Sequence, residues 1–401
     1  MLELEDALKK ILAALPTPEV EHVPFREAHE RVLAEGIQSS LDLPPFDNSA
    51  MDGYAVRAAD VGTARPGSPV SLRLCGRVAA GENFSGEVKS GECVRLFTGS
   101  AMPRGADAVV MQEDTRTDSA RQNEILICDT AKPGENVRER GSDVKRGTTL
   151  AEAGDILTPG KISLLAAAGV GTIGVGRRPR VGLLATGSEL CEAGQPLAPG
   201  QIYESNRATL SALISRVGSL PEIFPLVPDT LESTQRALDE ALNRCDVVVT
   251  SGGVSVGEMD FVKAAFERLG GELQFWKVAV RPGKPFVFGR CREKFLFGLP
   301  GNPVSAFVTF LLLVRPALLR WQGARQTTLP SHPGTLAEPL INHGDRRHFM
   351  RVRVNEAGKV FSAGPQTAQA LFPLASADGL VDVPAKKNLA AGTVVSVLRW
   401  Q

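Results

Sequence analysis

The sequence predicts a multidomain protein that combines an α/β domain of parallel-type sheet with β-rich domains. The chain has 401 residues, well above the roughly 150 residues of one typical domain. From Arg180 onward, strand-like runs alternate with helical patterns, which is typical of a sheet covered by helices. Elsewhere, short β-branched or alternating runs are separated by glycine and proline turns, which indicates β-rich domains.

The first expected domain is helical and discontinuous, with residues 1–44 and 142–178. Apolar residues recur at helical spacing at the start of the chain until Pro16 and Pro18 end the helix: Leu4, Leu8, Ile11, Leu12 and Leu15. Residues 25–34 predict a second helix. The segment 158–169, where Thr158 can cap and Pro159 suits the first turn, is expected to supply the partner surface.

Three further domains follow from the pattern of strands. An inserted β-rich domain is expected at 45–141, with runs such as 93–97 and 108–111. The α/β domain is expected at 179–325, with strands at 181–185, 247–250 and 295–298, and its last helix is predicted to start with Asn302 as cap and Pro303. Alternating segments at 349–354 and 394–398 predict a C-terminal β-barrel domain at 326–401.

Composition excludes several classes of protein. Lys plus Arg and Asp plus Glu are both 45, so no field of one sign is expected to bind nucleic acid or an acidic membrane. The six cysteines lie far apart without a CxxC pair, which argues against a zinc knuckle or a disulfide framework. The acidic N-terminal segment and the short apolar run 310–314, which stops at Arg315, predict a cytoplasmic protein without a membrane span.

Three unusual loops follow the three predicted strands, and ligands bind beyond the carboxyl ends of strands in open α/β sheets. The loops read TGSEL, SGGVSVGEMD and LPGNPVSAF. Gly252, Gly253 and Gly257 would let backbone amides approach a phosphate, with Ser255 as a hydroxyl donor. The helix start at Asn302 can also face an anion.

Three carboxylates, Glu189, Asp229 and Asp260, are expected around the same crevice, where they can hold Mg²⁺. The structural alternative is specific: Asp229 with Glu232 resembles a capping box, and Asp260 can cap the next helix. Taken singly, Asp229 and Asp260 each fit a cap better than a metal ligand.

Other polar segments leave both interpretations open. In RPGKP, Arg281 and Lys284 flank a glycine turn and suit either a second oxyanion or a solvated turn. PPFDNSAMDGYAV and FTGSAMPRGADAVV suit either turns or anion contacts; their polar residues include Asp47, Asn48, Ser49, Asp52, Thr98 and Ser100. The five histidines show no metal-site or triad spacing.

Six segments occur in this order: PPFDNSAMDGYAV, FTGSAMPRGADAVVMQED, TGSEL, SGGVSVGEMD, RPGKP and GLPGNPVSAF. The ordered set resembles the MoeA family of molybdopterin molybdenumtransferases, which includes the E domain of gephyrin, over nearly the whole chain. The resemblance implies four domains, an elongated homodimer and Mg²⁺-dependent insertion of molybdate into adenylylated molybdopterin, with release of AMP. Its implied protein partners are the adenylyltransferase that supplies the substrate and the apo molybdoenzymes that receive the product.

The resemblance also implies residue roles. Catalytic roles fall on Asp52, Thr98, Glu189, Asp229 and Asp260, of which the last three are the expected Mg²⁺ ligands, while Asp52 and Thr98 reach in from the second subunit. The implied pterin and phosphate contacts are Asn48, Ser49, Gly252, Gly253, Ser255, Gly257, Pro300, Gly301, Asn302 and Pro303. The implied oxyanion and other basic contacts are Arg281, Lys284, Ser305, Arg351, Arg138 and Arg140.

The chain departs from the family where the C-terminal domain usually carries a serine-containing segment. Here the sequence reads GPQTAQALFPL, and Thr367 is a partial substitute at most. Arg281 stands where a lysine is common. Two alternative functions remain: a molybdopterin adenylyltransferase, whose fold resembles residues 180–325 but which lacks the other domains, and a gephyrin-like scaffold. The sequence does not distinguish molybdate from tungstate.

Overall fold

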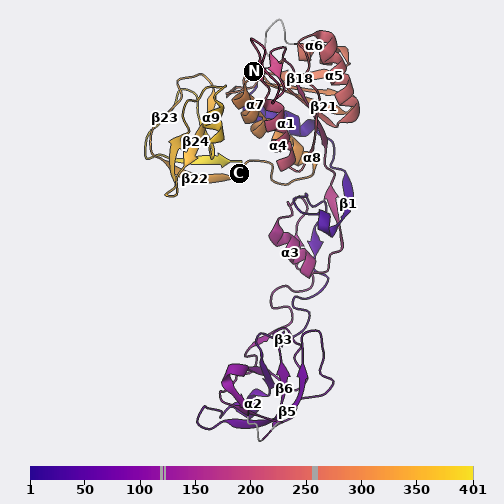
Figure 1. The fold of residues 1–401 in the computed structure, drawn as a ribbon, viewed down its shortest axis with the longest axis vertical. Helices are drawn as coiled ribbons and strands as arrows, with labels where there is room; N and C mark the ends of the chain where they lie inside the picture. Colours follow the sequence, from indigo (N-terminus) through magenta and orange to yellow (C-terminus); the bar gives the residue numbers. More distant parts are fainter. Residues whose placement is uncertain (118–120, 122, 255–260, 401) are drawn as a thin grey trace. The chain divides into compact units, whose positions relative to one another are not determined.

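The computed structural model describes residues 1–117, 121, 123–254 and 261–400, and the chain divides into two compact units (Figure 1). The larger unit comprises Met1–Glu35, Ala153–Thr158 and Thr172–Gln401, and the smaller unit comprises Gly36–Glu152 and Pro159–Gly171. Each unit contains its own clusters of buried apolar side chains. The predicted multidomain α/β plus β architecture is confirmed.

A six-stranded sheet with the order β16-β13-β17-β21-β20-β18 lies at the centre of the larger unit. Its strands are β13 (Arg180–Ala185), β16 (Leu220–Ile223), β17 (Val247–Ser251), β18 (Glu272–Trp276), β20 (Val287–Cys291) and β21 (Lys294–Leu299). The first four strands in the sheet order are parallel, as predicted. β20 and β18 are antiparallel additions at one side, so the sheet is mixed.

Alternating side chains of the central strands build one core on each face of the sheet. Val247 and Val249 of β17 point into the first core, whereas Val248 points into the second. The helices on the first face are α1 (Leu4–Ala14), α4 (Asn206–Arg216), α7 (Pro303–Thr309) and α8 (Arg315–Trp321). On the second face lie α5 (Leu231–Arg244) and α6 (Phe261–Arg268), which Figure 1 shows side by side.

The helix after β21 begins at Pro303, with Asn302 at the cap position as predicted, although the Asn302 side chain donates and accepts no capping hydrogen bond. It continues through the π-helical turn η3 (Phe310–Val314) into α8. By length and composition Pro303–Trp321 is the one helix among the described residues that could cross a membrane. However, 89% of its apolar window is buried inside the protein, so we interpret it as a core helix.

The C-terminal strands close into a small barrel, because β24 pairs with both β25 and β26. The strands of this sheet are β19 (Val280–Arg281), β22 (Ser331–Leu336), β24 (Arg347–Val354), β25 (Lys359–Ser362), β26 (Gly379–Val383) and β28 (Val394–Arg399). A short pair, β23 (Leu340–Ile341) and β27 (Asn388–Leu389), and helix α9 (Leu371–Ala375) complete this part. The predicted C-terminal barrel is therefore present.

The smaller unit is built on a sheet with the order β7-β4-β6-β5-β9-β8. These strands are β4 (Gly53–Val56), β5 (Val70–Val78), β6 (Glu92–Leu96), β7 (Ala108–Met111), β8 (Thr115–Thr117) and β9 (Glu124–Ile127). The remaining elements are β2 (Ile37–Gln38), β3 (Asn48–Ser49), β10 (Val137–Arg138), β11 (Thr149–Ala151), α2 (Ala58–Val61), η2 (Gln112–Asp114) and α3 (Pro159–Ala167). The strand-rich character predicted for this segment is confirmed.

Two expectations for the helical segments were wrong. Residues 25–34 form only the short turn η1 (Phe25–Glu27), because Val32 and Leu33 extend to bridge Ile156 and Val175. The preceding residues form β1 (Val20–Pro24), which pairs with β12 (Thr172–Gly176).

The core that helix α1 joins is not the predicted one. The buried α1 side chains Leu4, Ala7 and Ile11 join the core of the six-stranded sheet, whereas α3 belongs to the smaller unit. The four predicted domain boundaries remain a prediction.

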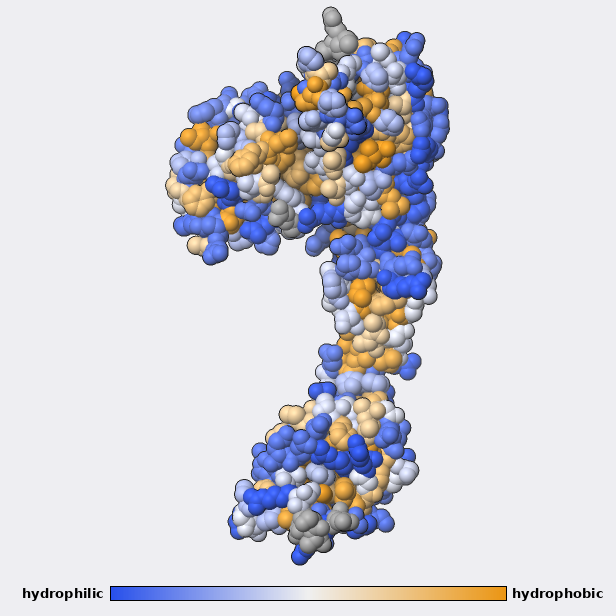
Figure 2. Space-filling view, in the orientation of Figure 1, coloured by the Kyte–Doolittle hydropathy of each residue, from blue (hydrophilic) through white to orange (hydrophobic). Residues whose placement is uncertain are grey.

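The apolar side chains of the larger unit lie mainly in these cores. Figure 2 shows hydrophilic side chains over much of the visible face of this unit, with apolar side chains in separate patches. The exposed apolar side chains include Tyr203, Leu371 and Phe372. The first two line the crevice described next.

Candidate substrate crevice

The three predicted loops meet at the carboxyl ends of β13, β17 and β21, where they line two adjoining cavities of the larger unit. The first has a volume of about 590 Å³ and the second about 300 Å³. Both are lined by Thr186, Glu189, Gly301 and Asn302. The predicted convergence of the loops in one crevice is thus observed.

Two of the three predicted carboxylates, Glu189 and Asp229, line the smaller cavity together. The Glu189 carboxylate lies over the backbone of Gly187, where an added Cβ would come within 2.7 Å of Glu189 Oε2. Asp260 lies outside the described residues, as do Ser255 and Gly257.

Asp229 is fixed by the TGSEL loop. Its Oδ2 accepts a hydrogen bond from the Ser188 backbone N–H at 3.0 Å, and its own N–H donates to Ser188 Oγ at 3.2 Å. The capping alternative for Asp229 is wrong, because Thr230 is the N-cap of α5 and its side chain accepts from the Ser233 N–H. Asp229 therefore lines the crevice and does not cap the helix.

Gly252 and Gly253 adopt φ angles of 90° and 67°, which other residues rarely reach. A Cβ on Gly252 would lie 2.7 Å from the Thr186 carbonyl oxygen, so the loop passes close to the TGSEL backbone. The Gly252 N–H donates to the Leu299 carbonyl at 3.1 Å and is thus not free for a phosphate. Both glycines still line the smaller cavity, as predicted.

The Pro300–Pro303 loop lines both cavities, and Asn206 holds it in place by hydrogen bonds. Asn206 Nδ2 donates to the Gly301 carbonyl and to Ser251 Oγ, both at 2.7 Å. The first N–H inside the helix, that of Val304, donates to the Ala368 carbonyl at 3.0 Å. The 365–371 segment of the C-terminal domain therefore borders the crevice, and its Gln369 and Leu371 line the larger cavity.

The RPGKP turn lies directly on the helix that follows the crevice. Gly283 has a φ of 108°, and a Cβ there would meet Thr309 Cγ2 at 2.3 Å, beside the carbonyl of Ser305. Arg281 stands opposite His348 in the pairing of β19 with β24. Arg281 and Lys284 are both exposed, so their side chains are accessible to an anion.

The charges of Arg281 and Arg351 both lower the pKa of one buried histidine, His348. His348 is 3% exposed, and its Nδ1 has no hydrogen-bond partner. Burial lowers the pKa of His348 to about 4, and the positive charges of Arg281, Arg351 and Arg346 add to this effect. The imidazole is therefore neutral at physiological pH, and the positive charge of the region comes from its arginines and Lys284.

Arg351 is 1% exposed, and some of its hydrogen-bond donors are used within the protein. Its Nη1 donates to the Thr367 carbonyl at 3.1 Å and its Nη2 to the Pro365 carbonyl at 2.5 Å, whereas its Nε has no partner. Burial lowers the pKa of the guanidinium. In place of the serine segment, Thr367 thus contributes its backbone carbonyl to hold Arg351.

The predicted site residues of the smaller unit form a second group. The Asp52 carboxylate accepts from the Thr98 N–H at 2.8 Å and from Thr98 Oγ1 at 2.9 Å. These two hydrogen bonds, together with the charge of Arg95, lower the pKa of Asp52. The structure thus brings Asp52 and Thr98 into direct contact, with the carboxylate ionised.

The remaining predicted residues of this unit have mainly internal partners. Asn48 and Ser49 are buried, and their side chains donate to the carbonyls of Phe46 and Met51. Arg140 forms an ion pair with Asp42 at 2.6 Å.

Arg138 lies beside Asn48 in the pairing of β3 with β10 and is exposed. Arg138 is therefore better placed than Arg140 to receive an anion.

Comparisons with known proteins agree with this arrangement. Family models match residues 2–169 (MoeA N-terminal region, domains I and II), 182–320 (probable molybdopterin binding domain) and 333–400 (MoeA C-terminal region, domain IV). The molybdopterin molybdenumtransferase of Haemophilus influenzae is 39% identical and is covered over 98% of its length by 99% of this chain. The chain belongs to the molybdopterin molybdenumtransferase family.

Other members of the molybdopterin molybdenumtransferase family show the same agreement. The Bacillus subtilis protein of that name is 32% identical over 99% of this chain and 94% of its own. The crystal structure of the MoeA protein from Pyrococcus horikoshii OT3 superimposes with a TM-score of 0.84 at 31% identity, with full coverage of both chains. The predictions of the family and of an enzyme are therefore confirmed.

The crevice residues are compatible with the divalent cation that the family resemblance implies. Mg²⁺ in proteins takes one or two carboxylates and completes its shell with waters and substrate phosphates. Glu189 and Asp229 provide two carboxylates on one cavity, and among the described residues neither forms an ion pair. Within the described part of the chain no group of three or more potential ligands occurs, and Asp260, the third carboxylate of the prediction, lies outside the described residues.

Two crevice residues were not singled out from the sequence. Thr186 lines both cavities, and its buried hydroxyl has no hydrogen-bond partner within the described structure. Asn206 links β17 to the Pro300–Pro303 loop. Their positions in TGSEL and at the start of α4 were the only available signals, because the contacts join segments far apart in the chain.

Proposed function

We propose that this enzyme inserts molybdate into adenylylated molybdopterin and releases AMP in a Mg²⁺-dependent reaction in the cytoplasm. The observation that supports the proposal most strongly is that Glu189 and Asp229 line the same cavity as the glycine loops at 252–253 and 300–301. Carboxylates beside such loops suit a phosphate-bound cation. The larger cavity beside it offers space for the pterin part of the substrate.

In this proposal Glu189 and Asp229 hold Mg²⁺ together with Asp260. The ion would neutralise negative charge on the substrate's phosphates. Asp229 needs no rearrangement to serve, because Ser188 already orients its carboxylate. The carboxylates also position the oxygen nucleophile that attacks the adenylyl phosphorus.

The chemical step breaks the phosphoanhydride bond of the substrate. Water forms a new P–O bond at the adenylyl phosphorus, the bond from this phosphorus to the bridging oxygen of the molybdopterin phosphate breaks, and AMP leaves with the water oxygen while one proton passes to solvent. Insertion joins both dithiolene sulfurs to molybdenum, and one oxo group of molybdate leaves as water with the two thiol protons. Negative charge develops on the departing phosphate oxygen, where the loop amides and nearby cationic side chains stabilise it. The unpartnered Thr186 hydroxyl is a further donor beside this position.

We assign the oxyanion substrate, molybdate, to the basic region around the RPGKP turn. Arg281 and Lys284 are accessible, Ser305 lies under the turn, and Arg351 keeps its Nε unpartnered. His348 adds no positive charge to this region, because its imidazole is neutral at physiological pH. Guanidinium groups suit tetrahedral oxyanions because they donate paired hydrogen bonds.

We propose that the enzyme acts as a homodimer, in which Asp52, Thr98 and Arg138 serve the crevice of the second copy. The family resemblance and the ionised, solvent-accessible Asp52 carboxylate support this part. The proposed protein partners are the adenylyltransferase that delivers the substrate and the apo molybdoenzymes that accept the product.

The test uses purified protein with adenylylated molybdopterin, molybdate and Mg²⁺, followed by assays for AMP and for reconstitution of an apo molybdoenzyme. Molybdate-dependent AMP release together with reconstitution is expected. Consumption of ATP with unadenylylated molybdopterin would support the adenylyltransferase alternative instead. Binding of a receptor-type peptide without any AMP release would support the scaffold.

A further inference from the structure

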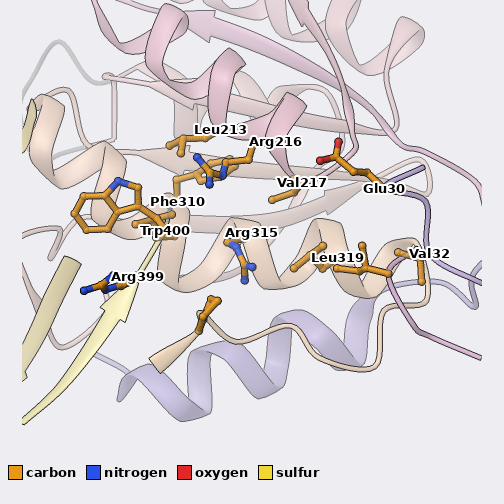
Figure 3. A pocket seen from close by; sticks show the side chains of 13 residues that line it. Glu30, Val32, Leu213, Arg216, Val217, Phe310, Arg315, Leu319, Arg399 and Trp400 are labelled. Atoms are coloured by element: carbon orange, nitrogen blue, oxygen red, sulfur yellow. The ribbon is translucent and has the colours of Figure 1, made fainter. Parts of the chain in front are cut away.

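A third cavity, of about 190 Å³, lies in the larger unit apart from the substrate crevice (Figure 3). Its walls come from α4, from the η3–α8 part of the core helix and from the end of β28, with Glu30, Val32, Ile156 and Pro330 at its border. None of its lining residues lines either crevice cavity. The proposed reaction therefore leaves it without a role.

Positive charge predominates in this cavity. Arg216 extends from the end of α4, Arg315 from the start of α8 and Arg399 from the end of β28 (Figure 3). Among the described residues that line it, Glu30 is the only acidic one. Three guanidinium groups against one carboxylate leave a surplus of two positive charges.

Two buried arginines elsewhere in this protein are neutralised by carboxylates, whereas a third, Arg351, bonds only to backbone carbonyls. Arg207 is 4% exposed and forms ion pairs with Glu204 and Glu192, and Arg31 is 5% exposed and pairs with Glu21. By contrast, within the described residues no ion pair involves any of the three cavity arginines. A partly desolvated cation without a counter-ion is costly, so an anion at this position would be stabilising.

Two of the three arginines also keep donor groups without an acceptor. Arg315 is half-buried and donates one hydrogen bond, from Nη1 to the Thr327 carbonyl at 2.8 Å. Burial and the charge of Arg216 lower the pKa of Arg315. The Nε of Arg399 is buried without a partner. The cavity therefore offers hydrogen-bond donors as well as charge.

The rest of the wall is apolar and partly aromatic. Leu213, Phe310 and Trp400 line the cavity, and the Trp400 ring is held by an edge-on contact with Phe307 at 5.1 Å between centroids. An apolar cavity of about 150 Å³ accommodates benzene, and drug-sized ligands need about 300 Å³ or more. The size thus suits one ring with a small charged group.

We propose that this cavity is a binding site for a small aromatic carboxylate. The ring packs against Leu213, Phe310 and Trp400, and the carboxylate receives hydrogen bonds from Arg216 and Arg315. Paired guanidinium donors and an apolar wall select for both parts of such a ligand. The site is separate from the crevice, and the inference does not depend on the proposed reaction.

The test is a titration of the protein with benzoate, followed by calorimetry and by tryptophan fluorescence, to which Trp400 in the cavity wall contributes. One benzoate per chain is expected to bind. Arg216→Gln and Arg315→Gln should each weaken binding about tenfold or more, because each removes a charge-assisted hydrogen bond. Arg236→Gln, which removes an exposed arginine of α5 outside the cavity, should bind benzoate as the parent does.

Two analogues separate the contributions of charge and ring. Benzamide, which is neutral, and acetate, which lacks the ring, should both bind much more weakly than benzoate.

The proposal is overturned if benzoate does not bind, if benzamide binds equally well, or if Arg216→Gln and Arg315→Gln bind benzoate like the parent. It is also overturned if benzoate binding disappears as the protein is concentrated, because a second copy of the chain would then occupy the cavity. Arg216 is exposed, so its variant is expected to fold even if Arg315→Gln does not.

Discussion

The buried arginines of this protein differ in whether a carboxylate neutralises them. Arg207 of α4 is neutralised by Glu204 and Glu192. Arg351 is 1% exposed but bonds only to backbone carbonyls, with Nε left over. Because an uncompensated buried cation is costly, the protein retains Arg351 at a cost in stability that an oxyanion substrate would offset.

His348 makes this region sensitive to acid. Its pKa is about 4 in the folded protein, against an ordinary 6.5, so between these pH values only the unfolded chain binds the proton. Stability should therefore fall as the pH drops from about 6.5 to about 4, by on the order of 3 kcal/mol. Urea unfolding at several pH values should show this component in the parent and not in His348→Gln.

The matched control is His332→Gln, which changes an exposed histidine. This variant should keep the pH dependence of the parent. If His348→Gln lost stability towards pH 4 as steeply as the parent and the control, the neutral state of His348 would be wrong.

At the scale of elements, the loop before α5 contains one side chain with a structural role, Thr230, and one with a proposed role in the crevice, Asp229. Thr230→Ala should lower the free energy of unfolding by about 1 kcal/mol, because it removes the N-cap hydrogen bond. AMP release per folded enzyme should stay close to that of the parent. Asp229→Ala should show the reverse pattern, with the cap intact and AMP release lost. A larger stability loss for Asp229→Ala than for Thr230→Ala would restore the capping interpretation.

The RPGKP turn depends on one glycine. Gly283→Ala should destabilise the protein by about 1–3 kcal/mol, since its φ of 108° and the contact with Thr309 both oppose a Cβ. It should also raise the KM for molybdate, because Arg281 and Lys284 flank this turn. Thermal unfolding and steady-state kinetics measure the two effects. Gly160→Ala, on a helix with open space around the glycine, should change neither.

The elements that the sequence predicted best are those fixed by local pattern. β13, β17 and β21 consist largely of apolar or β-branched residues that end at polar, glycine-rich loops, so their positions and the crevice at their ends followed directly. The helix expected at 25–34 did not form because Val32 and Leu33 form isolated bridges to Ile156 and Val175, which lie far away in the sequence. The carbonyl partners of Arg351 could not be predicted from the sequence either, because they depend on how the 365–367 segment folds back onto β24.

At the scale of the whole molecule, the candidate residues fall on two separate units, with Asp229 on the larger unit and Asp52 on the smaller. If each crevice uses residues from both copies of a dimer, two inactive variants can complement each other. Mixing Asp52→Asn with Asp229→Asn after subunit exchange should restore about a quarter of the parental AMP release, since half the dimers are mixed and each has one intact site. AMP release by each variant alone is the control. No recovery, despite proven exchange, would contradict the shared crevice.

The most direct test of the central claim, that Glu189 and Asp229 serve one phosphate site, is single-turnover AMP release from adenylylated molybdopterin with molybdate and Mg²⁺. Glu189→Gln and Asp229→Asn should each slow this step at least about 100-fold, while Asp239→Asn, which removes a surface carboxylate paired with Arg292, should leave it unchanged. Parental rates of AMP release in folded Glu189→Gln and Asp229→Asn would contradict the account.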